Sequence, residues 1–213
     1  MNEAASAGGR LRILDAGCGV GYGADFPPDA HVVGIDISEA ALARNRKLDE
    51  RILGDLQSYP LPSESFDLVV CHYVLEHVED PRAAVRNLAA SVRRGGELDI
   101  SIPILWSAKG LLTKLTPHSF HVWCYRRLFH FENAGKDGYG PFPTTLAITP
   151  RRLEEDLAAL GLEPVTRKTW RATLGLPSAL GLVWNAIGVV ERVLLPARGA
   201  TEYRARFRKV GPS

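Results

Sequence analysis

The residues best suited to bind a ligand are a run of alternating glycines and two carboxylates at the ends of apolar stretches. The segment "LDAGCGVGYGADF", residues 14–26, places Asp15 just before glycines at positions 17, 19, 21 and 23. Glycine adopts unusual backbone angles and lets a ligand approach the backbone closely. A second carboxylate, Asp36, ends the next apolar stretch. A carboxylate at a strand end can accept both hydroxyl hydrogens of a ribose, so the pattern predicts a nucleoside site.

The same glycines leave a dinucleotide site as an alternative. Residues 19–24, "GVGYGA", fit the fingerprint G-x-G-x-x-A. A dinucleotide site also needs a helix N-terminus directed at the pyrophosphate. Pro27 and Pro28 leave room for only a short helix after the glycines, and Asp15 would repel a doubly anionic ligand. The sequence therefore favours a cationic nucleoside, with a nicotinamide-cofactor oxidoreductase as the alternative.

Histidine is the side chain best suited to act as a base near neutral pH. His72 directly follows the apolar run "FDLVVC" and has the best position for catalysis. His77 lies in "LEHV", where packing or hydrogen bonding is the favoured role. His118, His121 and His130 come later in the chain.

His118 and His121 stand beside Trp123 and Tyr125 in the sequence. This mixture is typical of a cleft wall for an aromatic or amphipathic ligand, or of a loop packed on the sheet. The spacing of the two histidines fits one helix face, but no third ligand stands nearby. We therefore expect no metal site.

Apolar, strand-like stretches alternate with helix-like stretches, which predicts an α/β fold with a doubly wound, mostly parallel sheet. Ser38, Asp80 and Thr149 are the expected N-caps of helices over 38–50, 80–96 and 149–161, and Arg93, Arg94 and two glycines are expected to end the second helix. The expected strands cover residues 10–17, 31–38, 51–55, 66–74, 97–103, 162–170 and 201–210. In the last strand Tyr203 and Phe207 alternate with arginines, which predicts one buried and one charged face.

The segments "LDAGCGVGYG", "VVGIDIS", "GDLQSYPLPSESFDLVVCHYVLEHVEDP" and "RRGGELDISIP" together resemble class I S-adenosylmethionine-dependent methyltransferases. The most similar subgroup is the small-molecule type of ubiquinone and menaquinone biosynthesis. The resemblance is strong over residues 11–103 and returns near 148–165 and in the last strand. It implies a Rossmann-like, seven-stranded sheet whose last strand is reversed, and S-adenosylmethionine as cofactor with S-adenosylhomocysteine as product.

The resemblance also implies roles for single residues. The turn from Asp15 to Gly21 takes the methionine part and the ribose of the cofactor, and Asp36 takes the ribose hydroxyls. Ile37 packs on the adenine, and Asp55 and Leu56 take its amino group and ring face. The residues expected to bind the cofactor are thus Asp15, Gly17, Cys18, Gly19, Gly21, Asp36, Ile37, Asp55, Leu56 and His72.

His72 and His121 are the expected catalytic residues of a methyl transfer to an O, N or C atom. The acceptor is expected to be a small molecule of aromatic or amphipathic character. Its site is expected to include Tyr73, His118, Trp123, Tyr125 and Trp184.

The site needs a cover, because only about ten residues precede the first expected strand. We expect one domain over 1–213, with an insertion at 104–148 and a lid segment at 170–198 covering the site. Residues 172–190 carry no charge. They predict a helix with one bulky face, suited to a lid, a dimer contact or rest on a membrane, and less to a membrane span.

The bulk composition indicates a reduced, cytoplasmic protein. The three cysteines are far apart, and "MNEAASAGGR" at the start has no apolar run of a secretory signal. The net charge of +2 combines −6 over residues 1–100 with +8 over 101–213. Because the basic residues are dispersed, we expect no nucleic-acid partner, and either a monomer or a homodimer. A module that binds the cofactor without catalysis is the other alternative.

Overall fold

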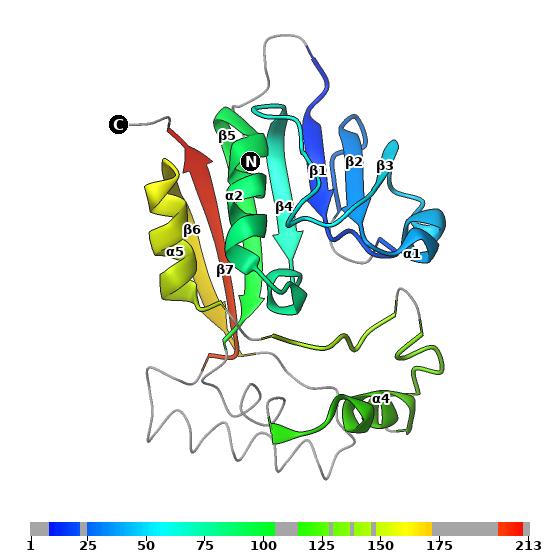
Figure 1. The fold of residues 1–213 in the computed structure, drawn as a ribbon. Coiled ribbons are helices and arrows are strands. Elements are labelled where there is room, and N and C mark those ends of the chain that lie inside the picture. Colours follow the sequence, from blue (N-terminus) through cyan, green and yellow to red (C-terminus); the bar gives the residue numbers. More distant parts are fainter. Residues whose placement is uncertain are drawn as a thin grey trace.

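The computed structural model describes residues 9–21, 25–104, 115–127, 130–136, 139–145, 148–171 and 200–210. A seven-stranded sheet forms its centre, with the strand order β3-β2-β1-β4-β5-β7-β6 (Figure 1). The strands are β1 (Arg12–Ala16), β2 (His31–Asp36), β3 (Glu50–Leu53), β4 (Phe66–His72), β5 (Val92–Pro103), β6 (Leu162–Trp170) and β7 (Glu202–Lys209).

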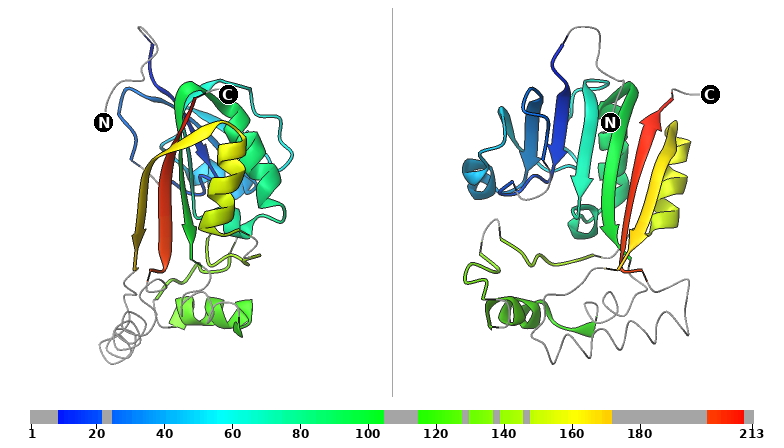
Figure 2. Two further views of the ribbon diagram at one scale, coloured as in Figure 1. Left: turned by 90° about the vertical axis from the view of Figure 1, so that its left-hand side faces the viewer. Right: turned by 180° about the vertical axis from the view of Figure 1, so that it is seen from behind.

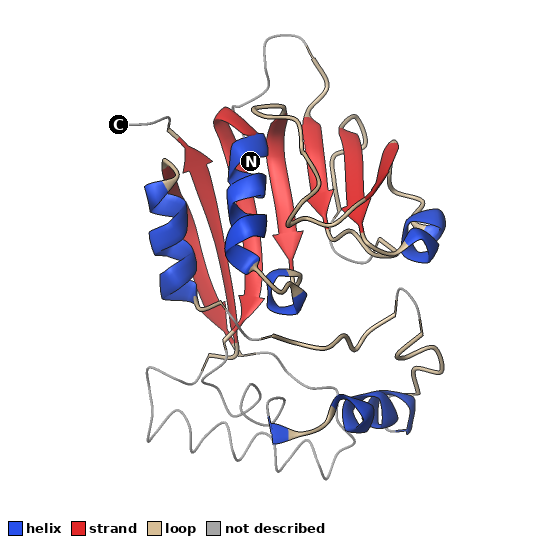
Figure 3. Cartoon of the chain, viewed as in Figure 1, coloured by secondary structure: helices blue, strands red, loops and turns tan. Residues whose placement is uncertain are grey.

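The strands β1 to β5 pair in parallel, and β7 pairs antiparallel with both β5 and β6. The predicted mostly parallel, seven-stranded sheet with a reversed last strand is therefore confirmed. Parallel pairing brings the carboxyl ends of β1, β2 and β4 to one edge of the sheet, which we call the carboxyl edge (Figure 3). Both Asp15 and Asp36 lie at this edge.

Helices α2 (Pro81–Ser91) and α5 (Pro150–Ala159) cover one face of the sheet and bury the main core. Asp80 and Thr149 accept from the backbone N–H groups of Ala83 and Arg152, as their expected N-cap roles require. On the opposite face, α1 (Glu39–Arg44) and the segment before β2 bury a smaller cluster around Ile13, at the β1 and β2 side of the sheet.

Two predicted helix ends are wrong. Helix α1 ends at Arg44, and α2 ends at Ser91, so Arg93 and Arg94 belong to β5. Val92 pairs with Phe66, and the register shifts before the pairing of Leu68 with Glu97. Gly95 has a φ of 72° in this irregular region. The glycines thus form a β-bulge in the strand, although their spacing after a helical run is typical of a C-cap.

The described part of the insertion lies beyond the carboxyl edge, as both views of Figure 2 show. It contains α4 (His118–Arg127) and an extended segment, 139–145. A short 3₁₀ helix, η1 (Leu75–His77), follows β4 on the sheet side of this segment. None of the helices in the described ranges has the length and apolar composition to span a membrane. The uncharged run 172–190, and with it most of the expected lid, lies outside the described residues.

Candidate cofactor and methyl-transfer site

The glycine turn is held against β2 through its backbone. The N–H groups of Gly17 and Cys18 donate to the carbonyl of Ile35, at 2.8 and 3.2 Å. Gly17, Gly19 and Gly21 have φ angles of 70°, 49° and 90°, which glycine adopts at little cost. The turn therefore requires glycine for its shape, before any ligand is considered.

The space around Gly17 and Gly19 differs. A Cβ on Gly17 would overlap the side chain of Val74, whereas a Cβ on Gly19 would meet no atom of the described chain within 4 Å. The glycine pattern predicts close approach of a ligand along the whole turn. At Gly17 the structure assigns the clash to the protein itself, and only Gly19 faces open space that a ligand can fill.

Asn45 holds the glycine turn in place through its side chain. The sequence did not reveal this role. This residue caps the C-terminus of α1, is fully buried, and points its side-chain amide at the carbonyls of Cys18 and Gly19, at 3.4 and 3.3 Å. The expected helix ran through position 45, which hid its role as a cap. Only an expected helix that ended at Arg44 would have revealed Asn45 as a cap.

Asp36 uses both carboxylate oxygens to shape the site. Oδ2 accepts from the Gly19 N–H and Oδ1 from the Ser38 N–H, each at 2.8 Å. The carboxylate is partly exposed, and each oxygen keeps acceptor capacity for a further donor. Asp36 thus anchors the turn and can still accept from the two hydroxyls of a ribose.

Asp15 is a buried carboxylate without a hydrogen-bond donor among the described residues, and only 7% of its surface is exposed. Burial raises its pKa to about 6, a nearby positive charge on His72 would lower it, and Asp36 raises it further. An ionised carboxylate in such surroundings is costly unless a cation approaches it. This arrangement suits a ligand that carries a positive charge.

The carboxyl ends of β2 and β3 present two exposed apolar side chains. Ile37 is 76% exposed and Leu53 is 56% exposed. Leu53 was not among the expected site residues. Leu56 was expected to pack on the adenine, but its side chain is 4% exposed and belongs to the main core. That prediction is wrong for the Leu56 side chain, because the turn after Asp55 directs it inward.

The Asp55 side chain is engaged within its own turn. It accepts from the backbone N–H of Gln57 at 2.8 Å and from the Gln57 side-chain amide at 3.0 and 2.9 Å. Its backbone carbonyl accepts from Ser58 and Tyr59. The site role of Asp55 stays a prediction, and the structure adds a turn-forming role.

His72 and Tyr73, at the end of β4, have different surroundings. His72 is largely buried, with Nε2 3.2 Å from Oδ1 of Asp99 on β5. Tyr73 has a φ of 57°, which is strained for a tyrosine, and stays 44% exposed. Burial and the carboxylates of Glu202 and Glu76 raise the pKa of Tyr73 to about 12.

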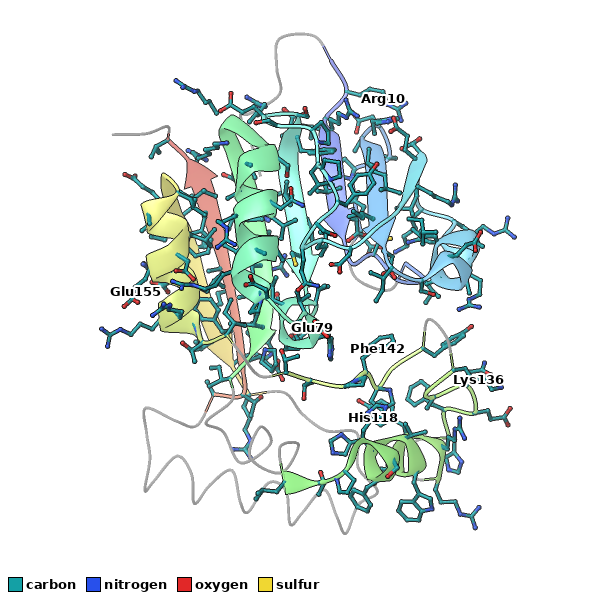
Figure 4. The ribbon with its side chains drawn as sticks, viewed as in Figure 1. Arg10, Glu79, His118, Lys136, Phe142 and Glu155 are labelled. Atoms are coloured by element: carbon teal, nitrogen blue, oxygen red, sulfur yellow. The ribbon has the colours of Figure 1, made fainter. Side chains whose placement is uncertain are left out.

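Segment 139–145 runs along the carboxyl edge (Figure 4). Contacts attach it to the rest of the protein at both ends. At one end Arg44 of α1 lies over the ring of Tyr139, 4.7 Å from its centroid. At the other, Thr145 donates from its N–H and its hydroxyl to the carbonyl of Glu76 in η1, at 2.7 and 3.1 Å. We call this segment the strap.

His77 joins the strap to η1. Its Nδ1 lies 2.6 Å from the carbonyl oxygen of Pro143, and its ring meets that of Phe142 edge-on at 5.6 Å. Because a carbonyl only accepts, Nδ1 carries the proton, and Nε2 is the basic nitrogen of the neutral ring. The hydrogen-bonding role expected for His77 is confirmed.

The structure places the histidines of α4 beyond the strap. His118 and His121 have ring centroids 6.5 Å apart, and Nε2 of His121 lies 2.5 Å from Oγ1 of Thr116. Trp123 and Tyr125 are exposed, and no residue of α4 is buried. The helix is therefore not packed on the sheet. Trp184 lies outside the described residues.

The residues at the carboxyl edge fit S-adenosylmethionine. Gly19 leaves open space, Asp36 offers two acceptor oxygens, Ile37 and Leu53 offer apolar surface, and Asp15 offers a negative charge. The Cys18 side chain is buried in the smaller core, and burial raises its thiol pKa to about 12. Cys18 can therefore meet a ligand only through its backbone.

Replacing Gly19 with alanine should weaken cofactor binding by about tenfold and leave the fold intact, because its Cβ enters only ligand space and a modest backbone strain is added. Calorimetry with S-adenosylhomocysteine and a melting curve would measure both effects. Gly17→Ala is the comparison, since its overlap with Val74 should lower the melting temperature. Unchanged affinity in Gly19→Ala would show that the turn has no ligand beside it.

The comparisons with known proteins agree with this geometry. Residues 14–100 match the family model described as "Methyltransferase domain". A protein of Mycolicibacterium smegmatis, named "Probable S-adenosylmethionine-dependent methyltransferase", is 40% identical over 96 residues, covering 43% of this chain and 37% of the relative. The ubiquinone biosynthesis O-methyltransferase of Hahella chejuensis is 33% identical over 141 residues, covering 58% of this chain and 59% of the relative.

Solved structures share the fold. An S-adenosylmethionine-dependent methyltransferase from Mesorhizobium loti superposes with a TM-score of 0.55 at 20% identity, covering 94% of this chain and 91% of that one. The [4+2]-cyclase SpnF superposes with a TM-score of 0.56 at 20% identity, covering 95% and 77%. Because one neighbour is described as a cyclase, the fold alone does not determine the reaction.

The chain spans 37% and 59% of the lengths of the two curated relatives. The matched residues include the glycine turn, Asp36 and the end of β4, which are the parts that build the site. The resemblance to S-adenosylmethionine-dependent methyltransferases is confirmed, and S-adenosylmethionine is the cofactor that the family implies. Residues 14–100 thus resemble the methyltransferase domains of S-adenosylmethionine-dependent enzymes.

Proposed function

We propose that the protein transfers a methyl group from S-adenosylmethionine to a small molecule held between the carboxyl edge and the strap. The observation that carries the proposal is the attachment of the strap at α1 and at η1, on either side of the glycine turn and Asp36. When bound, the cofactor supplies an activated methyl group, so the protein mainly has to align the acceptor and exclude water.

The cofactor-binding residues divide by chemistry. The backbone of Gly17, Cys18, Gly19 and Gly21 borders the methionine part and the ribose. Asp15 balances positive charge, Asp36 accepts from the ribose hydroxyls, and Ile37 with Leu53 borders the adenine. Asp55 and the backbone of Leu56 complete the adenine end in this proposal.

The acceptor is proposed to be a hydroxylated aromatic compound. Tyr73, Phe142 and Tyr139 bring aromatic surface to the carboxyl edge and the strap, which suits a flat, apolar molecule. The relative from Hahella chejuensis, an O-methyltransferase of ubiquinone biosynthesis, supports an oxygen acceptor. His118, Trp123, Tyr125 and Trp184 are proposed to line the outer end of this site.

An oxygen acceptor needs a base, and His77 fits that role better than His72 or His121. The His72 side chain is only 10% exposed, against 26% for His77, and His121 lies on α4 beyond the strap. His77 is fixed through Nδ1, which leaves Nε2 as the basic nitrogen beside the strap. Burial lowers the pKa of His77, the hydrogen bond to Pro143 offsets part of this effect, and His118 lowers it further. His77 is therefore neutral at pH 7 and ready to accept a proton.

The same proposal covers the setting of the reaction. We place it in the cytoplasm, on a free small molecule and not on a nucleic acid, with the chain acting as a monomer or a homodimer. The exposed aromatic side chains of α4 are proposed to allow peripheral membrane contact. Phe120 and Trp123 are both exposed and stack with their ring centroids 5.9 Å apart.

Two measurements test the proposed function. Mass spectrometry of ligands that co-purify with the full chain should find S-adenosylmethionine or S-adenosylhomocysteine. Incubation with methyl-labelled S-adenosylmethionine and a panel of catechols and hydroxybenzoates, with and without alkyl tails, should give labelled ether products. A nicotinamide cofactor in the first measurement would favour the oxidoreductase, and bound cofactor without turnover of the panel would favour the non-catalytic module.

The variant His77→Asn should lose about 100-fold in kcat/KM for whichever phenol of the panel reacts. The asparagine amide can still donate to the Pro143 carbonyl, so the strap should stay attached while the basic Nε2 is lost. In the wild type, kcat/KM should rise with pH through a pKa below about 6.5 and then level off, because only the neutral imidazole accepts a proton. This limb should be absent from the variant.

His31→Asn is the matched control, because His31 begins β2 at the opposite edge of the sheet and pairs with Glu50. Its kinetics should equal those of the wild type. A wild-type rate and pH profile in His77→Asn would restrict His77 to its structural role.

A further inference from the structure

The half of the sheet formed by β5, β7 and β6 has one face that no helix of the described residues covers. Figure 2 (right) shows these strands from the side away from α2 and α5, and no helix of the described ranges lies in front of them. The side chains on this face are mainly charged. Asp99 on β5 is paired with Arg206 on β7, and Lys168 on β6 is paired with Arg204 on β7, so the members of each pair lie on the same face.

The buried carboxylate of Asp99 accepts hydrogen bonds from two arginines of this face. Its oxygens accept from Nε and Nη2 of Arg204, at 2.8 and 2.7 Å, and from Nη2 of Arg206 at 2.9 Å. Burial alone would raise the pKa of Asp99, but the hydrogen bonds from Arg204, His72 and Arg206 hold it well below its usual range. The carboxylate is therefore ionised, and its acceptor capacity is used by the protein.

A cavity of about 290 Å³ opens on this face, lined by Asp99, Thr166, Lys168, Arg204 and Arg206. Its lining contains three positively charged side chains and one carboxylate. Glu97 balances only part of the excess, because it lies 3.5 Å from Arg206 and also accepts from Arg208 at 2.7 Å. No ion pair joins Lys168 to another residue within the described ranges.

The placement of Lys168 directly opposite Arg204 has an electrostatic cost, since like charges on paired positions repel. A ligand with negative charge would offset that cost. The cavity offers it an ammonium, a hydroxyl and the part of each guanidinium that Asp99 does not use. All of these groups donate, and guanidinium groups match the oxygens of phosphate and carboxylate.

We propose that this cavity binds a phosphate monoester. A dianion neutralises the two excess positive charges of the lining, which a single carboxylate does not. The volume is at the lower end for ligand sites, which suits a phosphoryl group with a small organic part. The site lies on the open sheet face, while the proposed cofactor site lies at the carboxyl edge, so the two can be occupied together.

Calorimetry at constant ionic strength tests the site, with inorganic phosphate and glycerol 3-phosphate as probes. The wild type should bind both saturably at millimolar concentration. Lys168→Gln should weaken binding about tenfold, because it removes one charge-assisted hydrogen bond, and Lys168→Glu should abolish it. Lys168 is exposed on an edge strand, so these variants should fold.

The control is Arg151→Gln on α5, which removes one exposed positive charge on the other side of the sheet. It should bind like the wild type. Vesicles containing phosphatidic acid, compared with phosphatidylcholine, distinguish a lipid headgroup from a free ester as the source of the phosphate. Binding of vesicles but not of free ester, lost in Lys168→Gln, would assign the lipid source. The proposal fails if neither the two free probes nor the vesicles bind, or if Arg151→Gln loses as much affinity as Lys168→Gln.

Discussion

Asp15→Asn should stabilise the ligand-free protein by about 1–3 kcal/mol at pH 7 while weakening the binding of S-adenosylmethionine at least tenfold. The ionised carboxylate is buried, receives no hydrogen bond from the described residues, and has its pKa raised by burial to about 6. Each pKa unit corresponds to about 1.4 kcal/mol, so ionising Asp15 at neutral pH costs up to about 3 kcal/mol of stability.

The pH dependence of this gain has a definite sign. A carboxyl whose pKa is raised on folding stabilises the folded state below its unfolded pKa of about 3.9. That contribution is lost as the pH rises towards about 6. Urea unfolding should therefore show the full difference between Asp15→Asn and the wild type at pH 7, and little difference near pH 4.

The binding loss should be specific for charge. The positively charged cofactor gains from an ionised Asp15, whereas the uncharged 5′-methylthioadenosine gains nothing from it. Asp15→Asn should thus bind 5′-methylthioadenosine like the wild type and S-adenosylmethionine more weakly. Equal losses for both ligands would mean that Asp15 acts through the shape of the turn. An unchanged or lower stability would contradict the burial argument.

The parts of the site that the sequence predicted are those determined by local position. Asp15 and Asp36 follow apolar strands, and a parallel sheet brings such residues to one edge whatever the remaining chain does. The caps Asp80 and Thr149 likewise depend on neighbours three residues away. The two carboxylates could be predicted from the order of the strands, and the two caps from the residues next to them.

The parts that it missed depend on contacts between distant residues. Arg204 and Asp99 are 105 positions apart, and His77 and Pro143 are 66 positions apart. Neither pair has a spacing that a single sequence reveals. Gly95 shows a local ambiguity of another kind, because a glycine after a helical run is typical of a C-cap, yet here the strand starts before it and bulges.

Asp36→Ala should lower the affinity for S-adenosylhomocysteine by about 2–4 kcal/mol, or roughly 30-fold to 1000-fold, since hydrogen bonds to a charged group contribute about 1.5–3 kcal/mol each. Two effects combine in this loss. The ribose loses its acceptor, and the Gly19 N–H, which now donates to Oδ2 at 2.8 Å, loses the carboxylate that fixes the turn.

A ligand analogue separates the two effects. The wild type should bind the 2′-deoxy form of S-adenosylhomocysteine more weakly than the natural product, because one hydroxyl donor is missing. Asp36→Ala should bind both forms equally, since the acceptor for that donor is gone. Asp29→Ala, which removes an exposed carboxylate from the segment before β2, should keep both the wild-type affinity and the discrimination. If Asp36→Ala still prefers the natural ribose as strongly as the wild type does, another residue reads the hydroxyls, and Asp36 only anchors the turn.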